Sequence, residues 1–343
     1  KLTVIGILIF ATGYIAMHWM NSLVMFFILY AGFIALGYQA GFYRAAVVLA
    51  NKWFIRHRSK ATGTVSVIYA LGGVVLVPVL GWVIIQYGWR IAAVIAGTAT
   101  LLIGLPLSLF IRNLPEDKGL LPDGEEVETK QATEEPSEAS REVAFTVREA
   151  IKTRAFWILA AAFVLRGFVV QAIWVHMVPL LVFKGFDEQG AANAIGLLLI
   201  FTLPSRFTFG WLGDIYPKRY LLMFACLIET FALIIVLTAQ SMWQVYLFVI
   251  VFALGYGVAP LDMAIVGDYF GRKNFATIQG IRAPVTALGV MAGPIYAGYI
   301  YDVTQSYEIV FITFMALYFL AAIVFIFARR PKPPARAVSY TPS

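Results

Sequence analysis

Ten long apolar runs dominate this chain of 343 residues and decide what it can fold into. A helix of about 20 apolar residues crosses the hydrocarbon core of a bilayer. Hydrophobic residues make up 61% of the chain and charged residues 13%, whereas soluble domains carry about 25% charged residues. We therefore predict an all-α polytopic membrane protein. The expected spans lie at 3–20, 23–51, 61–87, 90–111, 156–183, 190–212, 220–239, 242–267, 275–301 and 308–328.

Charge in the connecting segments predicts how the spans are oriented. Basic residues collect at 52–60, 213–219, 268–274 and after 329, while the alternate connections carry little or no charge. Positively charged segments face the cytoplasm, so both ends of this chain are expected there, in a membrane of the bacterial inner-membrane type. The net charge of +7 arises in these segments, so we read it as a sign of the lipid bilayer and expect no nucleic-acid partner.

Residues 113–154 interrupt the pattern with a run of Glu, Ser, Pro and Thr (DGEEVETKQATEEPSEAS). A segment with so few large apolar residues cannot bury enough surface to fold, and we expect a disordered acidic linker on the cytoplasmic side. The linker divides the chain into an N-terminal bundle, a C-terminal six-helix bundle and a cytoplasmic tail. Their predicted bounds are 1–112, 155–330 and 331–343.

An internal repeat relates the two bundles. ALGY occurs at 35–38 and again at 253–256, and Gly37 and Gly255 are 218 residues apart. Other Gly, Pro and Phe matches keep offsets of 216 to 218 residues over about fifty positions, which predicts a parallel duplication. The second half has two helices ahead of the point that aligns with the first residue. Twelve spans are therefore expected for the whole protein, of which this chain would hold the third to the twelfth.

The segment GWLGDIYPKRY at 210–220 resembles the cytoplasmic loop signature of the major facilitator superfamily. In that family the loop makes charge contacts that help to hold one conformational state. Ile215 and Pro217 depart from the pattern. NKWFIRHRSKATGTVSVIYALGG at 51–73 further resembles the monocarboxylate and oxalate/formate transporter branch. The resemblance implies two pseudo-symmetric helical bundles that work by alternating access. The matching loop residues are Gly210, Asp214, Lys218 and Arg219.

Charged residues inside the spans are the candidates for chemistry. A charge within a span is costly and faces a cavity or a partner. Arginines outnumber acids among them, and a guanidinium fork can bind both oxygens of a carboxylate, so the pattern favours an anionic substrate. The deep residues are Arg44, Arg166, Arg206, Asp262 and Glu229, the last expected to be structural, with Arg282 nearer a cytoplasmic end.

Arg206 and Thr202 take their interpretation from the resemblance. In the monocarboxylate branch an Arg at the position of Arg206, in the eighth helix, contacts the substrate carboxylate. The alternative is a structural Arg that joins the cytoplasmic loop network. Animal members of the branch often carry an Asp one turn earlier, where this chain has Thr202. That difference argues against a proton-coupling carboxylate beside Arg206.

Four further residues complete the predicted substrate site. Arg166 lies about 15 Å into its helix, near the midplane where substrate sites of such folds lie. His176 is about 80° around the same helix and could carry a coupled proton. The alternatives are a buried ion pair for Arg166 and a hydrogen-bonded packing role for His176. Arg44 and Asp262 occupy matching repeat positions, and we expect either a salt bridge that acts as a gate or a binding pair for a polar substrate.

The predicted function is secondary active transport of a small organic anion, such as a monocarboxylate, by proton symport or by anion exchange (antiport). We expect a monomer. We also expect no enzyme, because the chain has neither H-E-x-x-H nor a G-x-x-x-x-G-K-[ST] loop. Cys226 is the lone cysteine, which excludes an internal disulfide, and we expect no metal and no cofactor. The alternatives are an exporter of a larger or cationic compound selected by Asp262, or a membrane receptor or scaffold that does not transport.

Overall fold

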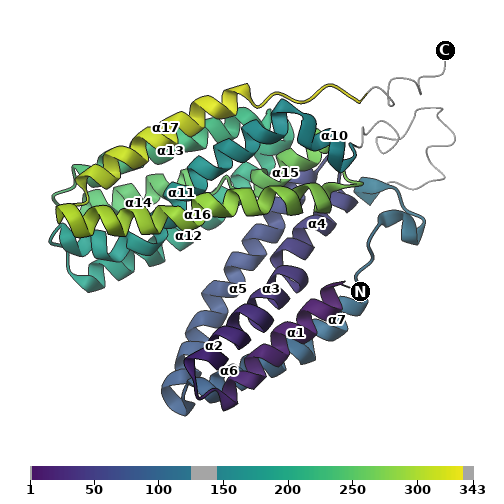
Figure 1. The fold of residues 1–343 in the computed structure, drawn as a ribbon, viewed down its shortest axis with the longest axis horizontal. Coiled ribbons are helices and arrows are strands. Elements are labelled where there is room, and N and C mark those ends of the chain that lie inside the picture. The colour runs from purple at the N-terminus through teal and green to yellow at the C-terminus, as the bar shows by residue number, and fades with distance from the viewer. Residues whose placement is uncertain (1, 125–144, 335–343) are drawn as a thin grey trace. The chain divides into compact units, whose positions relative to one another are not determined.

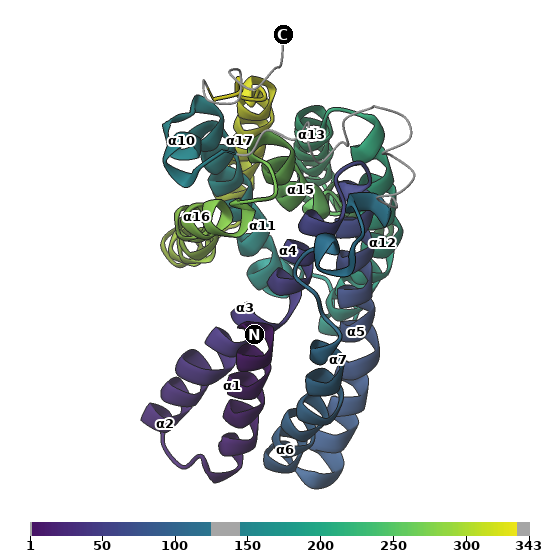
Figure 2. The ribbon, with the colours of Figure 1, turned by 90° about the vertical axis from the view of Figure 1, so that its right-hand side faces the viewer.

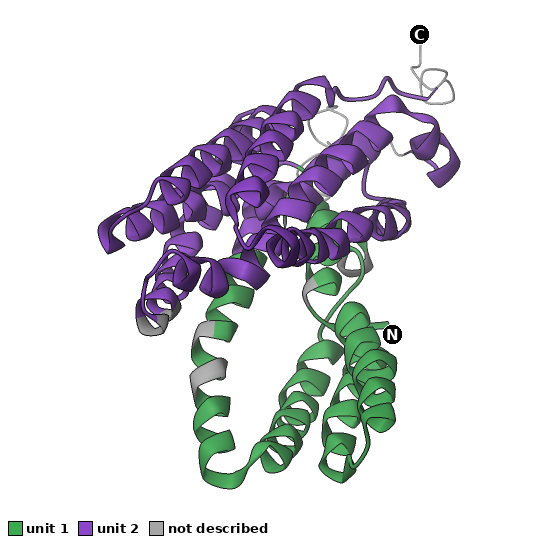
Figure 3. Ribbon diagram, turned by 60° about the vertical axis from the view of Figure 1, so that its left-hand side comes forward, with its two compact units in different colours: residues 1–55, 65–139 green, residues 56–64, 140–343 purple. Residues whose placement is uncertain are grey.

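The structure is a computed structural model, and it describes residues 2–124 and 145–334. The described residues form helices and no strand (Figure 1). Residues 125–144, about half of the predicted linker, and the end of the predicted tail lie outside them. The chain separates into two compact units, drawn in different colours in Figure 3: residues 1–55 with 65–139, and residues 56–64 with 140–343.

The described residues include nine helices long and apolar enough to cross a membrane. They coincide with nine of the ten predicted apolar runs, which confirms the all-α polytopic class. The remaining run, 61–87, lies in α5 (Arg58–Tyr87), a single helix of 30 residues. The number of ten spans stays a prediction.

The first unit is held together by close backbone contacts at glycines. A Cβ atom on Gly6 would lie 2.5 Å from the main-chain nitrogen of Gly41, and one on Gly37 would lie 2.5 Å from that of Phe10. Only glycine permits such an approach between helices. α1 accordingly packs against α3, as Figures 1 and 2 show, and also against α6. The helices of this unit are α1 (Leu2–Ala16), α2 (Leu23–Phe27), α3 (Leu36–Gly41), α4 (Tyr43–Trp53), most of α5, α6 (Trp89–Ala99) and α7 (Leu105–Leu109), with π-helical stretches at Ile28–Ala35 and Thr100–Gly104.

The second unit contains the larger buried core. α11 packs most extensively against α16, α13 against α17 and α14, and α12 against α14. Aromatic side chains fill the core, and Phe252 and Tyr318 are fully buried. Gly289 of α16 lies against the backbone of α11 at Val164, where a Cβ atom would clash. The helices of this unit are α10 (Val147–Lys152), α11 (Arg154–Phe183), α12 (Glu188–Ile215), α13 (Lys218–Leu237), α14 (Met242–Tyr256), α15 (Ala259–Phe270), α16 (Phe275–Thr304) and α17 (Glu308–Phe327).

The two ALGY copies both lead into an interrupted helix. After the first copy, α3 ends and Phe42 leaves the helical conformation, with φ −117° and ψ −124°, before α4 begins. After the second copy, α14 ends at Tyr256 and α15 begins at Ala259, with Gly257 and Val258 between them. Val258 follows Phe42 by 216 residues, the same offset as the repeat. Each unit thus contains one span that is broken at the equivalent position.

Candidate functional site

The signature loop of the second unit binds the start of α5. The carboxylate of Asp214 accepts the main-chain N–H groups of Ser59 at 2.8 Å and of Lys60 at 3.1 Å. These N–H groups belong to the first turn of a helix and have no partner within it, so a carboxylate there is stabilising. Gly210 allows the approach, because a Cβ atom on it would lie 3.0 Å from the Ser59 carbonyl oxygen. The Asp of the predicted loop is thus a helix cap.

The basic part of the loop continues into an ion-pair network. Lys218 and Arg58 both meet the carboxylate of Asp268, the Arg58 contact at 3.0 Å. Arg58 is 2% exposed. Arg219 instead stacks on the neighbouring Tyr220 ring and donates to its hydroxyl at 2.7 Å. Sequence reasoning missed Arg58 and Asp268 as members, although the basic cluster at 52–60 and the GDYFGRK segment carried the signal.

Arg166 and Glu229 form a buried, two-contact ion pair between α11 and α13. Nε of Arg166 donates to Oε2 of Glu229 at 3.1 Å, and Nη2 donates to Oε1 at 2.5 Å. The side chains are 9% and 0% exposed. The fork of Arg166 is therefore occupied by a protein carboxylate, which is the buried ion pair that the sequence left as an alternative. The structural role expected for Glu229 agrees with this geometry.

Asp262 meets Arg282, on α16, in the second unit. Nη2 of Arg282 donates to Oδ1 of Asp262, and Nε donates to the side-chain oxygen of Gln279 at 2.9 Å. The guanidinium also lies over the ring of Phe163, 4.6 Å from its centre. Arg44 is half-buried in α4 of the first unit. The expected pair between Arg44 and Asp262 stays a prediction, and sequence reasoning did not foresee that Arg282 would be the partner of Asp262 within the unit.

Arg206 lies beside an aromatic surface in the spans of the second unit. Its guanidinium carbon is 5.6 Å from the centre of the Tyr256 ring, and this ring lies 5.7 Å from that of Trp174. Arg206 is half-buried, in contrast to Arg166 and Arg282. Thr202, one turn earlier, is buried and donates its hydroxyl to the Leu198 carbonyl at 2.6 Å. α12 therefore presents a guanidinium group beside aromatic rings.

His176 is satisfied on both ring nitrogens. Its Nε2 lies 3.0 Å from the carbonyl oxygen of Pro294, which can only accept, so this nitrogen carries the proton. Its Nδ1 lies 3.2 Å from the hydroxyl of Tyr307, which then donates to it. Burial raises the pKa of Tyr307, and the neighbouring Tyr301 and Asp302 raise it further. A hydrogen-bonded imidazole that links α11 to α16 fits the packing alternative for His176.

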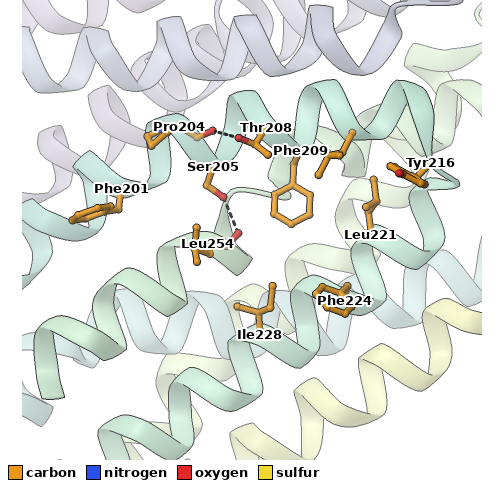
Figure 4. A pocket seen from close by; sticks show the side chains of 11 residues that line it. Phe201, Pro204, Ser205, Thr208, Phe209, Tyr216, Leu221, Phe224, Ile228 and Leu254 are labelled. Atoms are coloured by element: carbon orange, nitrogen blue, oxygen red, sulfur yellow. Dashed lines mark hydrogen bonds between the residues drawn. The ribbon is translucent and has the colours of Figure 1, made fainter.

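An apolar pocket of about 510 Å³ lies among α12, α13 and α14 (Figure 4). Its lining includes Phe201, Phe209 and Phe224. The hydroxyls of Ser205 and Thr208 are turned to main-chain carbonyls, as the dashed lines in Figure 4 show. None of the predicted substrate residues lines this pocket. Among the described residues, no group of three or more His, Cys, Asp or Glu side chains could hold a metal ion.

Comparison with known proteins extends these observations. The sequence model described as Major Facilitator Superfamily matches residues 1–259 and 185–342. Monocarboxylate transporter 12 of Mus musculus is 22% identical over 339 residues, which cover 90% of this chain and 67% of the relative. Monocarboxylate transporter 4 of Gallus gallus is 25% identical over 319 residues, covering 90% of this chain and 64% of that protein. The hexuronate transporter of Escherichia coli (strain K12) is 22% identical over 259 residues, covering 71% and 59%.

Solved structures share the fold. The transporter FucP in its outward conformation superposes with a TM-score of 0.70 at 17% identity, over 96% of this chain and 82% of FucP. The human organic anion transporter MFSD10 gives a TM-score of 0.68 at 16% identity, over 95% and 75%. The loop signature, the apolar helices and the family match agree, which confirms the resemblance stated from sequence. The chain is a multi-pass integral membrane protein and belongs to the Major Facilitator Superfamily.

Proposed function

We propose that the protein is a secondary active transporter that moves a small organic anion by alternating access. The names of its relatives refer to monocarboxylates and hexuronates, and both kinds of compound carry a carboxylate group. The observation that carries the proposal is the position of Arg206. Arg206 is a half-buried guanidinium within the spans, and it lies beside the ring of Tyr256.

The arrangement around Arg206 suits a carboxylate with a small organic body. A guanidinium fork binds both carboxylate oxygens, and binding pockets combine such a group with apolar and aromatic walls. Tyr256 supplies an aromatic face next to Arg206, and Trp174 lies against the ring of Tyr256. In this proposal Arg206 orients the anion and the two rings contact its carbon atoms.

The remaining predicted residues take supporting roles in this proposal. The contacts of Asp214 and Asp268 to the start of α5 help to hold one conformational state. The two-contact pair with Glu229 supports a structural role for Arg166. His176 stays a candidate proton carrier for symport, since a neutral imidazole can accept a proton when Tyr307 turns its hydroxyl away. Anion exchange needs no such carrier, so the proposal includes both proton symport and anion exchange as the source of energy for transport.

The sequence alternatives receive less support from the geometry. An exporter of cations selected by Asp262 would need that carboxylate for its substrate, but Asp262 meets Arg282 in the structure. A direct transport measurement distinguishes the proposed transporter from a receptor or scaffold that does not transport.

Counterflow in proteoliposomes tests the proposal. The product of the complete gene is reconstituted with an internal carboxylate such as lactate, oxalate or glucuronate, and entry of the labelled compound is followed. We expect protein-dependent exchange with at least one carboxylate, and a loss of about tenfold or more with Arg206→Gln because the fork is removed. Arg329→Gln, which changes an exposed arginine in the same way, should exchange normally. Absence of exchange for every carboxylate would refute the proposal, and normal exchange by Arg206→Gln would remove Arg206 from the site.

A further inference from the structure

Arg282 has a buried donor that nothing in the described chain accepts. The residue is 3% exposed. Nη2 reaches Asp262 and Nε reaches Gln279, but Nη1 is buried and meets no hydrogen-bond acceptor among the described residues. Buried polar groups are almost always hydrogen-bonded. The face of the Phe163 ring covers the guanidinium but supplies no oxygen. The two N–H groups of Nη1 therefore lack an acceptor within the described chain, and the oxygen atoms of a bound ligand would satisfy them.

Asp262, the acid of the pair, is the accessible member. Its side chain is 30% exposed, ten times the exposed fraction of Arg282. Its carboxylate contacts the guanidinium through one oxygen and one nitrogen, Oδ1 and Nη2. A carboxylate placed across Nη1 and Nη2 would make two parallel charge-assisted hydrogen bonds, which is the stronger geometry. Asp262 thus binds Nη2 of the guanidinium, while Nη1 is buried and meets no acceptor among the described residues.

The surroundings hold the fork in place independently of Asp262. The oxygen of Gln279 accepts from Nε of Arg282, and the amide nitrogen of Gln279 lies 2.5 Å from the sulfur of Met263. Phe163 packs against the flat face of the guanidinium. A binding group whose orientation is fixed by such neighbours loses little order when a ligand arrives.

We propose that Arg282 is a second anion-binding residue of the transporter and that Asp262 is its built-in competitor. A substrate carboxylate, or another planar oxyanion, displaces Asp262 and binds Nη1 and Nη2 together. A buried guanidinium needs one negative charge beside it, and either the aspartate or the ligand supplies that charge. The partial exposure of Asp262 lets its carboxylate turn to water when it is displaced. This inference rests on the proposed transport of an organic anion and names a second contact for it.

Carboxylate binding to the purified protein tests the inference. The product of the complete gene is titrated with lactate, oxalate or glucuronate, with chloride as the control anion, and the apparent Kd is read from thermal stabilisation. We expect Asp262→Asn to bind about tenfold more tightly, because the competing charge is gone, and Arg282→Lys to bind about tenfold more weakly, because the fork is lost. Asp302→Asn makes the same change at an exposed position of α16 and should leave the Kd unchanged.

The opposite signs separate a binding role from a structural one. Both roles predict that Asp262→Asn lowers the ligand-free melting temperature, but a purely structural pair predicts that affinity does not improve, and that result overturns the inference. Should either single variant fail to fold, the double variant Asp262→Asn with Arg282→Gln keeps the local charge balanced. Loss of carboxylate binding in this double variant supports the inference, and undiminished binding overturns it.

The result also distinguishes this inference from the proposed function. If the unmodified protein exchanges and binds a carboxylate but Asp262→Asn binds it no more tightly, only the role of Arg282 is wrong. If counterflow detects no carboxylate and neither the unmodified protein nor Asp262→Asn binds one, both are wrong.

Discussion

Two guanidinium–carboxylate pairs in the second unit differ in how much of each is open. In the Arg166–Glu229 pair, two nitrogens meet two oxygens and both side chains are sealed. In the Arg282–Asp262 pair, a sealed guanidinium meets one oxygen of a carboxylate that is 30% exposed. The same two chemical groups therefore form a pair buried on both sides in one place and a pair with an accessible carboxylate in another. The exposure of the carboxylate, 0% for Glu229 and 30% for Asp262, distinguishes the two pairs.

The largest expected effect is on the sealed pair. Glu229→Gln leaves the charge of Arg166 buried without a counter-charge and should lower the free energy of unfolding by about 3–5 kcal/mol. Chemical unfolding in detergent micelles measures this loss. The double variant Arg166→Met with Glu229→Leu should recover most of it, since a well-packed apolar pair often replaces a buried ion pair at little cost. Near-normal stability of Glu229→Gln alone would contradict the conclusion that this buried ion pair stabilises the packing of α11 against α13.

The half-open pair should respond less strongly to the matching change. Asp262→Asn should lower the free energy of unfolding by about 1–3 kcal/mol, because water can reach this side of the pair. The same unfolding measurement, run beside Glu229→Gln, gives the difference directly. A loss equal to that of Glu229→Gln would remove the contrast between the two pairs.

A third carboxylate extends the comparison, because Asp214 binds main-chain N–H groups in place of a guanidinium. Asp214→Ala should cost about 1 kcal/mol, the usual value of a helix N-cap. Hydrogen exchange should become faster at the amides of Ser59 and Lys60. Asp187→Ala is the control: it removes the cap of α12 and should affect the amide of Gly190 instead. Unchanged exchange at Ser59 would show that Asp214 is not the cap.

The smallest expected effect concerns Tyr307, a neutral hydrogen-bonded group. Tyr307→Phe should lower the free energy of unfolding by about 0.5–1.5 kcal/mol by removing the hydrogen bond to His176. Because its pKa is raised in the folded state, Tyr307 stabilises the fold below the unfolded pKa of about 10, and this contribution is lost as the pH rises toward the folded pKa. Melting temperatures between about pH 9 and pH 11 should therefore fall less steeply in Tyr307→Phe than in the unmodified protein. An equal slope would exclude this contribution.

The spans and the loop were predictable because their signals are local. Hydropathy summed along about 20 residues placed nine membrane helices, and the spacing within GWLGDIYPKRY marked Asp214. The partners of the deep charges were not predictable in this way. The repeat aligned Arg44 with Asp262 as equivalent positions, but the partner of Asp262 within its unit is Arg282, on the next helix. Equivalence in a duplication says nothing about contact.

The sequence by itself determined that this is a polytopic helical membrane protein built on a repeated plan. The length of the apolar runs and the spacing of the glycines can be read without knowing how the helices pack. Only the tertiary structure decided that Glu229 pairs with Arg166 through two contacts and that Asp262 pairs with Arg282 through one. Those pairings depend on how each helix is rotated and where its neighbours press against it. A rotation of one residue is about 100° around a helix, enough to exchange a partner while leaving the hydropathy of the span unchanged.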